Sequence, residues 1–386
     1  MTAHGTPRER PAAGAARAAV ILAGVKTEDV KPEGADTVLF HTEGRTGVVT
    51  LNRPGALNAL THPMVIRIDA TLAAWEADPA VQQVLIRGAG ERGLCAGGDI
   101  RAIHDDAKAG NTASAGFWRD EYRLNARIAR YPKPYVALMD GITMGGGVGV
   151  SAHGSVRIVT ERSRVAMPET GIGFVPDVGG TYLLGRAPGH LGTHLALTGT
   201  AVGAADALLC GLADHFVPAE RLPELTAALA GAPAHEVLPR YAATPGPGEL
   251  ADRRGWIDRC YAADTVEEIV ERLLGQGEPA AKEAAETILA KSPTALKVTL
   301  AALRRAAQLG PLERVLAQEF RVSCNGLTAP DLVEGIRAQV VDKDRAPRWS
   351  PATLAEVTEA DVERFFAPLG EDRELRLPPP EDLSRG

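Results

Sequence analysis

One segment, residues 135–182, constrains the fold of this chain more than any other part of its sequence. It contains two short apolar runs, Tyr135–Met139 and residues 156–160, whose lengths fit buried strands. A triple glycine follows the first run, and loops rich in glycine and proline that carry carboxylates follow the second. A loop of backbone donors together with carboxylates in one compact segment indicates chemistry on an acyl group.

The carboxylates of this segment are Glu169, within Met167-Pro168-Glu169, and Asp177, within Pro176-Asp177-Val178-Gly179-Gly180. A single Pro-Glu pair usually marks only the start of a helix. Here it stands among glycines in a stretch with few other charges. Because a carboxylate on an apolar wall has a raised pKa and can act as a base or nucleophile, both residues are candidate catalytic groups.

Two glycine-rich loops are candidate oxyanion-binding elements. Cys95-Ala96-Gly97-Gly98-Asp99 follows an expected strand at residues 81–87, and Gly145-Gly146-Gly147 follows the strand at Tyr135–Met139. Small residues let backbone N–H groups face a ligand directly, and a helix start adds positive potential. Each loop alone is more often a plain strand-to-helix turn, but two from neighbouring strands can converge on one carbonyl oxygen.

Other sites suggested by the sequence are weaker. Residues 147–152 match the dinucleotide fingerprint G-x-G-x-x-A, with Glu169 about 20 residues further on. This match sits in mid-chain without a βαβ unit that opens a domain, so we rank it low. His190 and His194 have metal-ligand spacing, but Leu191 stands where a zinc protease has glutamate, and no metal site is expected.

Along the chain, strands alternate with helices as far as about residue 182, and helices dominate after it. This order is typical of an α/β fold. Amphipathic helices are expected over residues 264–274, 280–290, 293–308, 311–324 and 331–341. The expected organisation is a disordered N-terminal tail at 1–35, a core at 36–230 and a C-terminal helical region at 231–386.

Composition excludes several classes of partner. The net charge is -7 and no run rich in lysine and arginine occurs, so nucleic acid is not an expected partner. No apolar run approaches the ~18 residues of a membrane span. The four cysteines lie far apart without CxxC spacing, which favours a reduced, cytoplasmic protein. An organellar transit peptide is disfavoured because Glu9 and Pro11 interrupt the arginine-rich start.

Four motifs taken together resemble those of the crotonase (enoyl-CoA hydratase/isomerase) superfamily. They are Asn52-Arg53-Pro54 with Leu57-Asn58-Ala59-Leu60, Cys95-Ala96-Gly97-Gly98-Asp99-Ile100, Gly145-Gly146-Gly147 and Met167-Pro168-Glu169. The resemblance implies an α/β core, a crotonase-like spiral of ββα units that binds coenzyme A thioesters. It also implies an oxyanion hole at the N–H groups of Gly98 and Gly146. The residues implied along the substrate and its CoA are Leu57, Asn58, Ala96, Gly97, Asp99, Ile100 and Gly145.

One departure and two further matches indicate a branch of this superfamily. Hydratases of the superfamily carry a glutamate three residues beyond the middle glycine, where this chain has Gly149. Residues 168–180 and the tail motif at 331–349 resemble the 3-hydroxyisobutyryl-CoA hydrolases instead.

This resemblance implies hydrolysis of the thioester 3-hydroxyisobutyryl-CoA to 3-hydroxyisobutyrate and CoA, in valine catabolism. Glu169 would act as nucleophile or general base and Asp177 as its partner, with no cofactor beyond the substrate's own coenzyme A. An enoyl-CoA hydratase or isomerase and a non-catalytic acyl-CoA-binding protein stay as alternatives. Homo-oligomers are common in the superfamily, and the extra C-terminal helices could cover the surface that such oligomers use.

Overall fold

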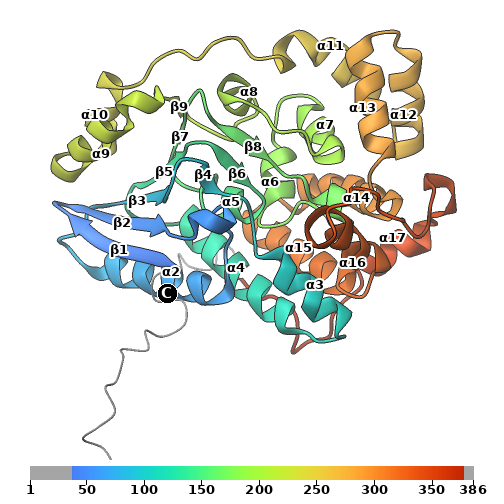
Figure 1. Ribbon diagram of the computed structural model, residues 1–386, viewed down its shortest axis with the longest axis horizontal. Coiled ribbons are helices and arrows are strands. Elements are labelled where there is room, and N and C mark those ends of the chain that lie inside the picture. The colour runs from blue at the N-terminus through green and yellow to red at the C-terminus, as the bar shows by residue number, and fades with distance from the viewer. Residues whose placement is uncertain (1–36, 378–386) are drawn as a thin grey trace, which may run out of the picture. The chain divides into compact units, whose positions relative to one another are not determined.

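The computed structural model describes residues 37–377, so the tail predicted at 1–35 lies outside the described residues (Figure 1). A sheet of six strands runs in the order β1-β2-β3-β5-β7-β9. Its first pair is antiparallel and the remaining pairs are parallel. The strands are β1 Val38–Glu43, β2 Thr46–Leu51, β3 Gln83–Gly88, β5 Tyr135–Met139, β7 Val156–Val159 and β9 His215–Phe216.

A second sheet contains three short parallel strands, β4 (Gly93–Cys95), β6 (Ile142–Met144) and β8 (Arg164–Ala166). Each follows a strand of the large sheet and precedes a helix, so β3-β4-α3, β5-β6-α5 and β7-β8 with a 3-10 helix repeat one pattern. The helices are α3 (Ile100–Lys108) and α5 (Gly146–Gly149). This repeat confirms the expected α/β spiral of ββα units.

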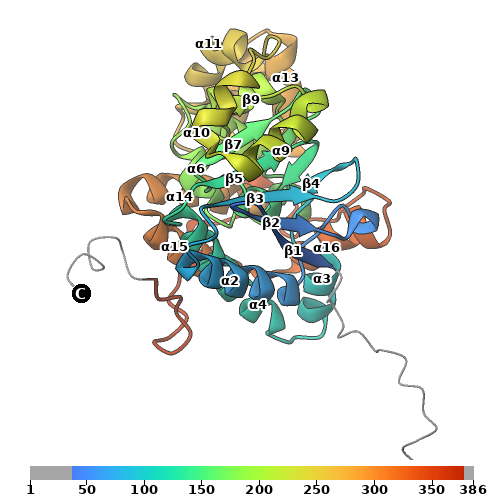
Figure 2. The same ribbon diagram turned by 90° about the vertical axis from the view of Figure 1, so that its left-hand side faces the viewer.

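The large sheet is covered on both faces, which explains why its central strand β5 is apolar and buried throughout. Along β3, Val84 and Ile86 pack in the main core that includes residues of α2 (His62–Ala77) and α4 (Ala113–Ala129). Leu85 points the other way, into a core completed by α9 (Leu222–Gly231) and α10 (Ala234–Val237). Figure 2 shows α2 and α4 on one side of the sheet and α9 and α10 on the opposite side.

Helices fill the chain after β9. Beyond α9 and α10, the α-helices are α11 Leu250–Tyr261, α12 Val266–Gly275, α13 Pro279–Leu289, α14 Pro293–Leu309, α15 Leu312–Gly326, α16 Pro330–Ile336 and α17 Glu359–Phe365. The prediction of one helix over 331–341 is wrong at its end, because α16 is followed by a π-helix at Arg337–Val341. Within residues 37–377, no helix is long and apolar enough to cross a membrane.

Three of the late helices pack against the early part of the chain. α15 lies against α4, α14 lies against α6 (Gly180–Leu184), and α16 contacts both α3 and the 3-10 helix Glu169–Ile172. The separation into a core and a C-terminal helical region stays a prediction. What the contacts establish is that helices near residue 330 touch the segment that carries Glu169.

Glycine permits the contact between α16 and that 3-10 helix. A Cβ placed on Gly335 would lie 2.3 Å from the carbonyl carbon of Ile172. We expect Gly335→Ala to destabilise the protein by about 1–3 kcal/mol, because backbone atoms cannot move aside as a side chain can. The measurement is the urea concentration at half-unfolding.

Gly255→Ala is the matched control, since Gly255 lies inside α11 with only the end of the Arg259 side chain within 4 Å. Alanine should leave stability unchanged or raise it there, because it restricts the unfolded chain. Equal unfolding midpoints for the two variants would contradict the close packing inferred for α16.

Candidate active site

The carboxyl ends of the three short strands bring three loops to one place. β4 pairs with β6 and β6 with β8, all parallel, with Met144 opposite Ala166. Parallel strands end at the same edge of a sheet, so the residues that follow them become neighbours. The loop after β4 holds Gly98, the loop after β6 holds Gly145 and Gly146, and the loop after β8 holds Glu169.

The predicted oxyanion-hole glycines, Gly98 and Gly146, come from neighbouring loops that approach each other closely. A Cβ added to Gly146 would lie 3.3 Å from the Gly98 nitrogen and 2.6 Å from Glu121 Oε1. Gly145 has φ +50°, and a Cβ there would lie 3.0 Å from Glu169 Oε1. No hydrogen bond from either the Gly98 or the Gly146 N–H is found among the described residues. Positions 145 and 146 therefore require glycine, because a side chain there would collide with a neighbouring carboxylate and crowd the two backbone N–H groups.

These loops border a cavity of ≈ 320 Å³. Its apolar wall includes side chains from α3, α4 and α16, and Lys291 is the basic residue among the described residues that line it. The full lining is Ala96, Gly97, Gly98, Ile100, Ile103, Phe117, Trp118, Glu121, Gly145, Gly146, Pro168, Glu169, Gly171, Ile172, Phe174, Asp177, Val178, Lys291, Leu332, Ile336 and Gln339.

Three carboxyl groups share this cavity, two predicted and one not. Glu169 and Asp177 are each 6% exposed, and Glu121 is 2% exposed. Burial raises the pKa of Glu169 well above its ordinary value, and the nearby charge of Asp177 raises it further. Burial likewise raises the pKa of Glu121, with Asp177 again adding to the effect. The pKa of Asp177 rises to about 7 through burial, opposed by a hydrogen bond from Tyr122.

Glu121 is the site residue that sequence reasoning missed. It lies on α4, one turn after Phe117 and one turn before Asn125, on the buried face of that helix. Its Oε1 has no hydrogen-bond partner among the described residues, and neither has Glu169 Oε2. The sequence did contain a signal for Glu121, because an acidic residue lies there on the apolar face of an amphipathic helix. Burying a carboxyl without a partner costs free energy, so such a residue is a candidate functional group.

The structure leaves no room for a side chain at position 149. A Cβ on Gly149 would lie 2.7 Å from Val178 Cβ and 2.9 Å from Asn125 Nδ2. Val178 itself has φ +51°, a strained conformation for a β-branched residue, and this turns its side chain toward α5. The space beside the triple glycine is thus filled from the loop that carries Asp177.

The residues implied along the CoA divide into two groups. Ala96, Gly97, Ile100 and Gly145 line the cavity together with the oxyanion-hole glycines. Leu57, Asn58 and Asp99 do not border it. Asn58 Oδ1 accepts from the Arg53 N–H at 2.9 Å, and Nδ2 donates to the carbonyls of Ala89 and Gly93 at 3.0 and 3.1 Å. Asp99 pairs with Arg53 at 3.0 Å. These side chains hold the two loops together.

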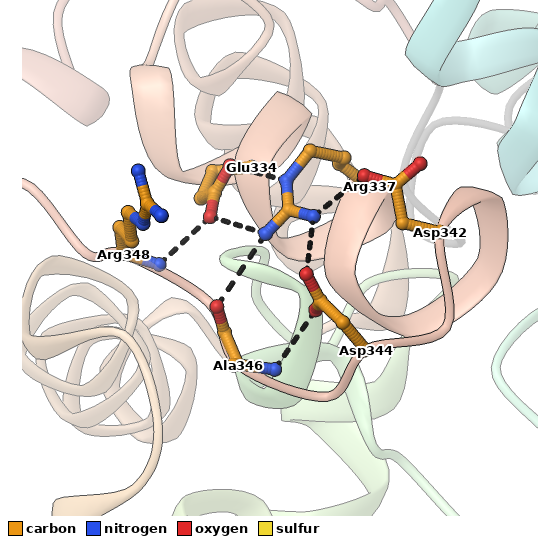
Figure 3. A network of polar contacts seen from close by, with 6 residues as sticks. All are labelled: Glu334, Arg337, Asp342, Asp344, Ala346 and Arg348. Carbon is orange, nitrogen blue, oxygen red and sulfur yellow. Dashed lines mark hydrogen bonds and ion pairs between the residues drawn. The ribbon is translucent and has the colours of Figure 1, made fainter.

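The tail motif at 331–349 forms a polar network beside the cavity (Figure 3). Arg337 pairs with Glu334 at 2.8 Å and with Asp342 and Asp344 at 2.7 Å each. Glu334 also accepts from the Arg348 N–H at 2.8 Å. One guanidinium thus fixes the π-helix and the loop after it against α16, whose Leu332 and Ile336 form part of the cavity wall.

Comparison with known proteins gives a consistent family. A model of the enoyl-CoA hydratase/isomerase family matches residues 46–366. A Danio rerio protein named "3-hydroxyisobutyryl-CoA hydrolase, mitochondrial" is 45% identical over 88% of this chain and 91% of its own. The Homo sapiens protein of the same name is 44% identical over 88% of this chain and 90% of its own.

Solved structures give the same fold under other names. A protein described as a carnitinyl-CoA dehydratase from Mycobacterium thermoresistibile is 57% identical, with TM-score 0.86 over 88% of this chain and 98% of its own. One described as an enoyl-CoA hydratase from Rhodobacter sphaeroides is 45% identical, with TM-score 0.84 over 88% of this chain and 100% of its own.

The predicted cytoplasmic location is contradicted, because the curated relatives are named as mitochondrial proteins. The prediction rested on free, widely spaced cysteines, and the described structure does keep all four unpaired. Free thiols report a reducing environment and do not identify the compartment that provides it.

The raised pKa values predict how stability depends on pH. A carboxyl whose pKa is raised on folding binds its proton more tightly in the folded protein. The stabilisation is complete below the ordinary pKa near 4.5 of a glutamate and is lost as pH rises through the folded-state value. We expect the urea unfolding midpoint to fall as pH rises above the ordinary range of a glutamate pKa, and Glu121→Gln to reduce this fall.

The control is Glu283→Gln on the exposed face of α13, which should leave the pH dependence as it is in the unmodified protein. A Glu121→Gln profile that coincides with this control would show that Glu121 is ionised in the folded protein.

Proposed function

Since the chain belongs to the enoyl-CoA hydratase/isomerase family, we propose that it hydrolyses 3-hydroxyisobutyryl-CoA to 3-hydroxyisobutyrate and CoA, a step of valine catabolism. The observation that carries the proposal is that Val178 and Asn125 fill the space at Gly149, while Glu169 and Asp177 line the cavity. Syn addition of water to a double bond requires two carboxylates placed beside it, and the glutamate that hydratases of the superfamily carry at this position is absent here. The names of the curated relatives support the same reaction.

The thioester oxygen would accept hydrogen bonds from the N–H groups of Gly98 and Gly146. Attack on the carbonyl carbon places a negative charge on this oxygen, which develops in the transition state and is complete in the tetrahedral intermediate. Fixed backbone donors need no rearrangement at that moment, and each such donor is typically worth roughly 100-fold or more in rate. The absence of any competing acceptor for these two N–H groups among the described residues supports this role.

Glu169 would supply the attacking oxygen in one of two ways. Its carboxylate could attack the carbonyl carbon, expel CoA as the thiolate and form an anhydride that water then cleaves. It could instead take a proton from a water molecule that attacks the carbonyl. In both routes water is consumed, and the thiolate leaves with a proton as free CoA. The position of Glu169 Oε1 beside the Gly145 backbone is compatible with both routes.

Asp177 and Glu121 would assist from the same wall. A pKa near 7 suits Asp177 for taking up and giving back a proton near neutral pH. Glu121 keeps its proton well above its ordinary pKa, so it can donate a hydrogen bond to the hydroxyl of the acyl group. The substrate's own CoA is the only additional group that this chemistry requires.

A hydratase or dehydratase is the second candidate, because the names of two similar solved structures describe such activities. A paired assay separates the candidates. One arm measures thiol release from 3-hydroxyisobutyryl-CoA, and the other measures loss of the conjugated thioester absorbance of crotonyl-CoA. Thiol release without hydration supports the proposal. Hydration without thiol release would favour the hydratase instead. No activity in either assay would favour a non-catalytic acyl-CoA-binding protein.

Glu169→Gln should lower kcat by about a thousandfold or more, with little change in substrate binding, because the amide can neither attack nor take a proton. Asp177→Asn should also lose most of the rate. The measurements are single-turnover thiol release and equilibrium binding of a CoA ester. Glu283→Gln is again the control, and a Glu169→Gln protein that keeps its rate would remove Glu169 from the chemistry.

Gly149→Glu should not create a hydratase. The new side chain would meet Val178 and Asn125, so we expect lower stability by about 1–3 kcal/mol and no gain in hydration of crotonyl-CoA. The measurement is the hydration rate beside the urea unfolding midpoint. A stable variant that hydrates crotonyl-CoA would show that position 149 alone separates the two reactions.

A further inference from the structure

The backbone of the loop that carries Asp177 is held by two buried side chains, Glu319 and His153, from separate parts of the chain. Glu319 on α15 accepts from the Gly179 N–H at 2.6 Å, from the Thr181 N–H at 2.9 Å and from Thr181 Oγ1 at 2.5 Å. His153 Nε2 lies 2.7 Å from the carbonyl oxygen of Val178. Burial lowers the pKa of His153 to about 4, so it is neutral near pH 7 and donates to this carbonyl from Nε2. These contacts hold the strained backbone of the loop.

The carboxyl of Asp177 has a separate partner. Tyr122 on α4 lies next in the chain to Glu121 and is completely buried, and its hydroxyl donates to Asp177 Oδ2 at 2.7 Å. The same hydroxyl lies 2.8 Å from Ser323 Oγ on α15. An ionised carboxylate can only accept, so the Tyr122 proton points to Asp177 and Ser323 must donate to Tyr122. The chain of donors therefore runs from Ser323 through Tyr122 to Asp177.

We propose that Tyr122 is a positioning residue for Asp177: it fixes one carboxylate oxygen in the protein, leaves the other for the cavity and favours the ionised form. Neither Tyr122 nor Ser323 lines the cavity, so both act through Asp177. The polarised Ser323 hydroxyl strengthens the bond that Tyr122 donates. The proposal rests on the proposed function only in giving Asp177 a role in catalysis.

The titratable groups near Asp177 include carboxyls and one histidine. Besides burial, the charge of Asp177 raises the pKa of Glu121 on α4, of Glu169 in the 3-10 helix and of Glu319 on α15. His153 is neutral and does not compensate for them. Burial favours the protonated form of Asp177, and the hydrogen bond from Tyr122 is the largest opposing contribution. Loss of this bond should therefore raise the pKa of Asp177.

The test is Tyr122→Phe, which removes one oxygen atom from a buried ring. We expect the acidic limb of kcat/KM against pH to move upward by about one pH unit or more, with kcat reduced and KM changed little. Ser323→Ala should move the limb in the same direction by less, and it tests the proposal even if Tyr122→Phe folds poorly. Tyr131→Phe is the matched control, since its buried hydroxyl donates at 2.8 Å to the Leu72 carbonyl, away from the cavity.

A second readout separates this proposal from the proposed function. The Asp177 carboxyl is titrated by carbon NMR of aspartate-labelled protein, with Asp177→Asn to assign the signal, and this needs no turnover. An upward shift in Tyr122→Phe but not in Tyr131→Phe supports the proposal, even for a protein that releases no thiol. An unchanged Asp177 titration in both Tyr122→Phe and Ser323→Ala, or an equal shift in Tyr131→Phe, would overturn it.

Discussion

The parallel pairing of β4, β6 and β8 is the constraint on which the candidate site depends. These strands are only three residues long, yet their pairing brings together loops separated by tens of residues in the chain. Because all three run in one direction, their carboxyl ends share an edge, and every loop that follows meets the next. The large sheet supports this arrangement, since each of its strands from β3 to β7 leads into one of the short ones.

The same arrangement creates an electrostatic conflict that the rest of the fold controls. Glu121, Glu169 and Asp177 line one small cavity, where burial and mutual repulsion oppose the ionisation of all three carboxyls together. The structure distributes protons among them by giving them different partners. Asp177 receives a hydrogen bond from Tyr122, whereas Glu121 Oε1 and Glu169 Oε2 have none among the described residues. Different ionisation states in one cavity are what acid–base chemistry near neutral pH requires.

The late helices complete the site, although they lie far from it in sequence. α15 provides Ser323 and Glu319 behind the Asp177 loop, and α16 provides Leu332 and Ile336 at the cavity wall. Gly335 allows α16 to contact the backbone of the segment that carries Glu169. The Arg337 network then fixes the chain that follows α16 (Figure 3). The C-terminal third is thus part of the site and not only a cover over the core.

The sequence by itself determined the α/β alternation and the positions of the two glycine loops, and it predicted the Glu169–Asp177 pair, because these features depend on contiguous patterns of apolar runs, glycines and carboxylates. The spiral of ββα units followed from the resemblance to a family. It predicted four of the late helices well, since their apolar faces repeat at helical spacing. Only the tertiary structure decided that Glu121 faces the cavity and that the Asn58 side chain does not. Periodicity assigns a residue to a buried face but does not say which neighbour or cavity that face meets. The partners that set the ionisation of Asp177 come from α4 and α15, and packing alone brings those helices together.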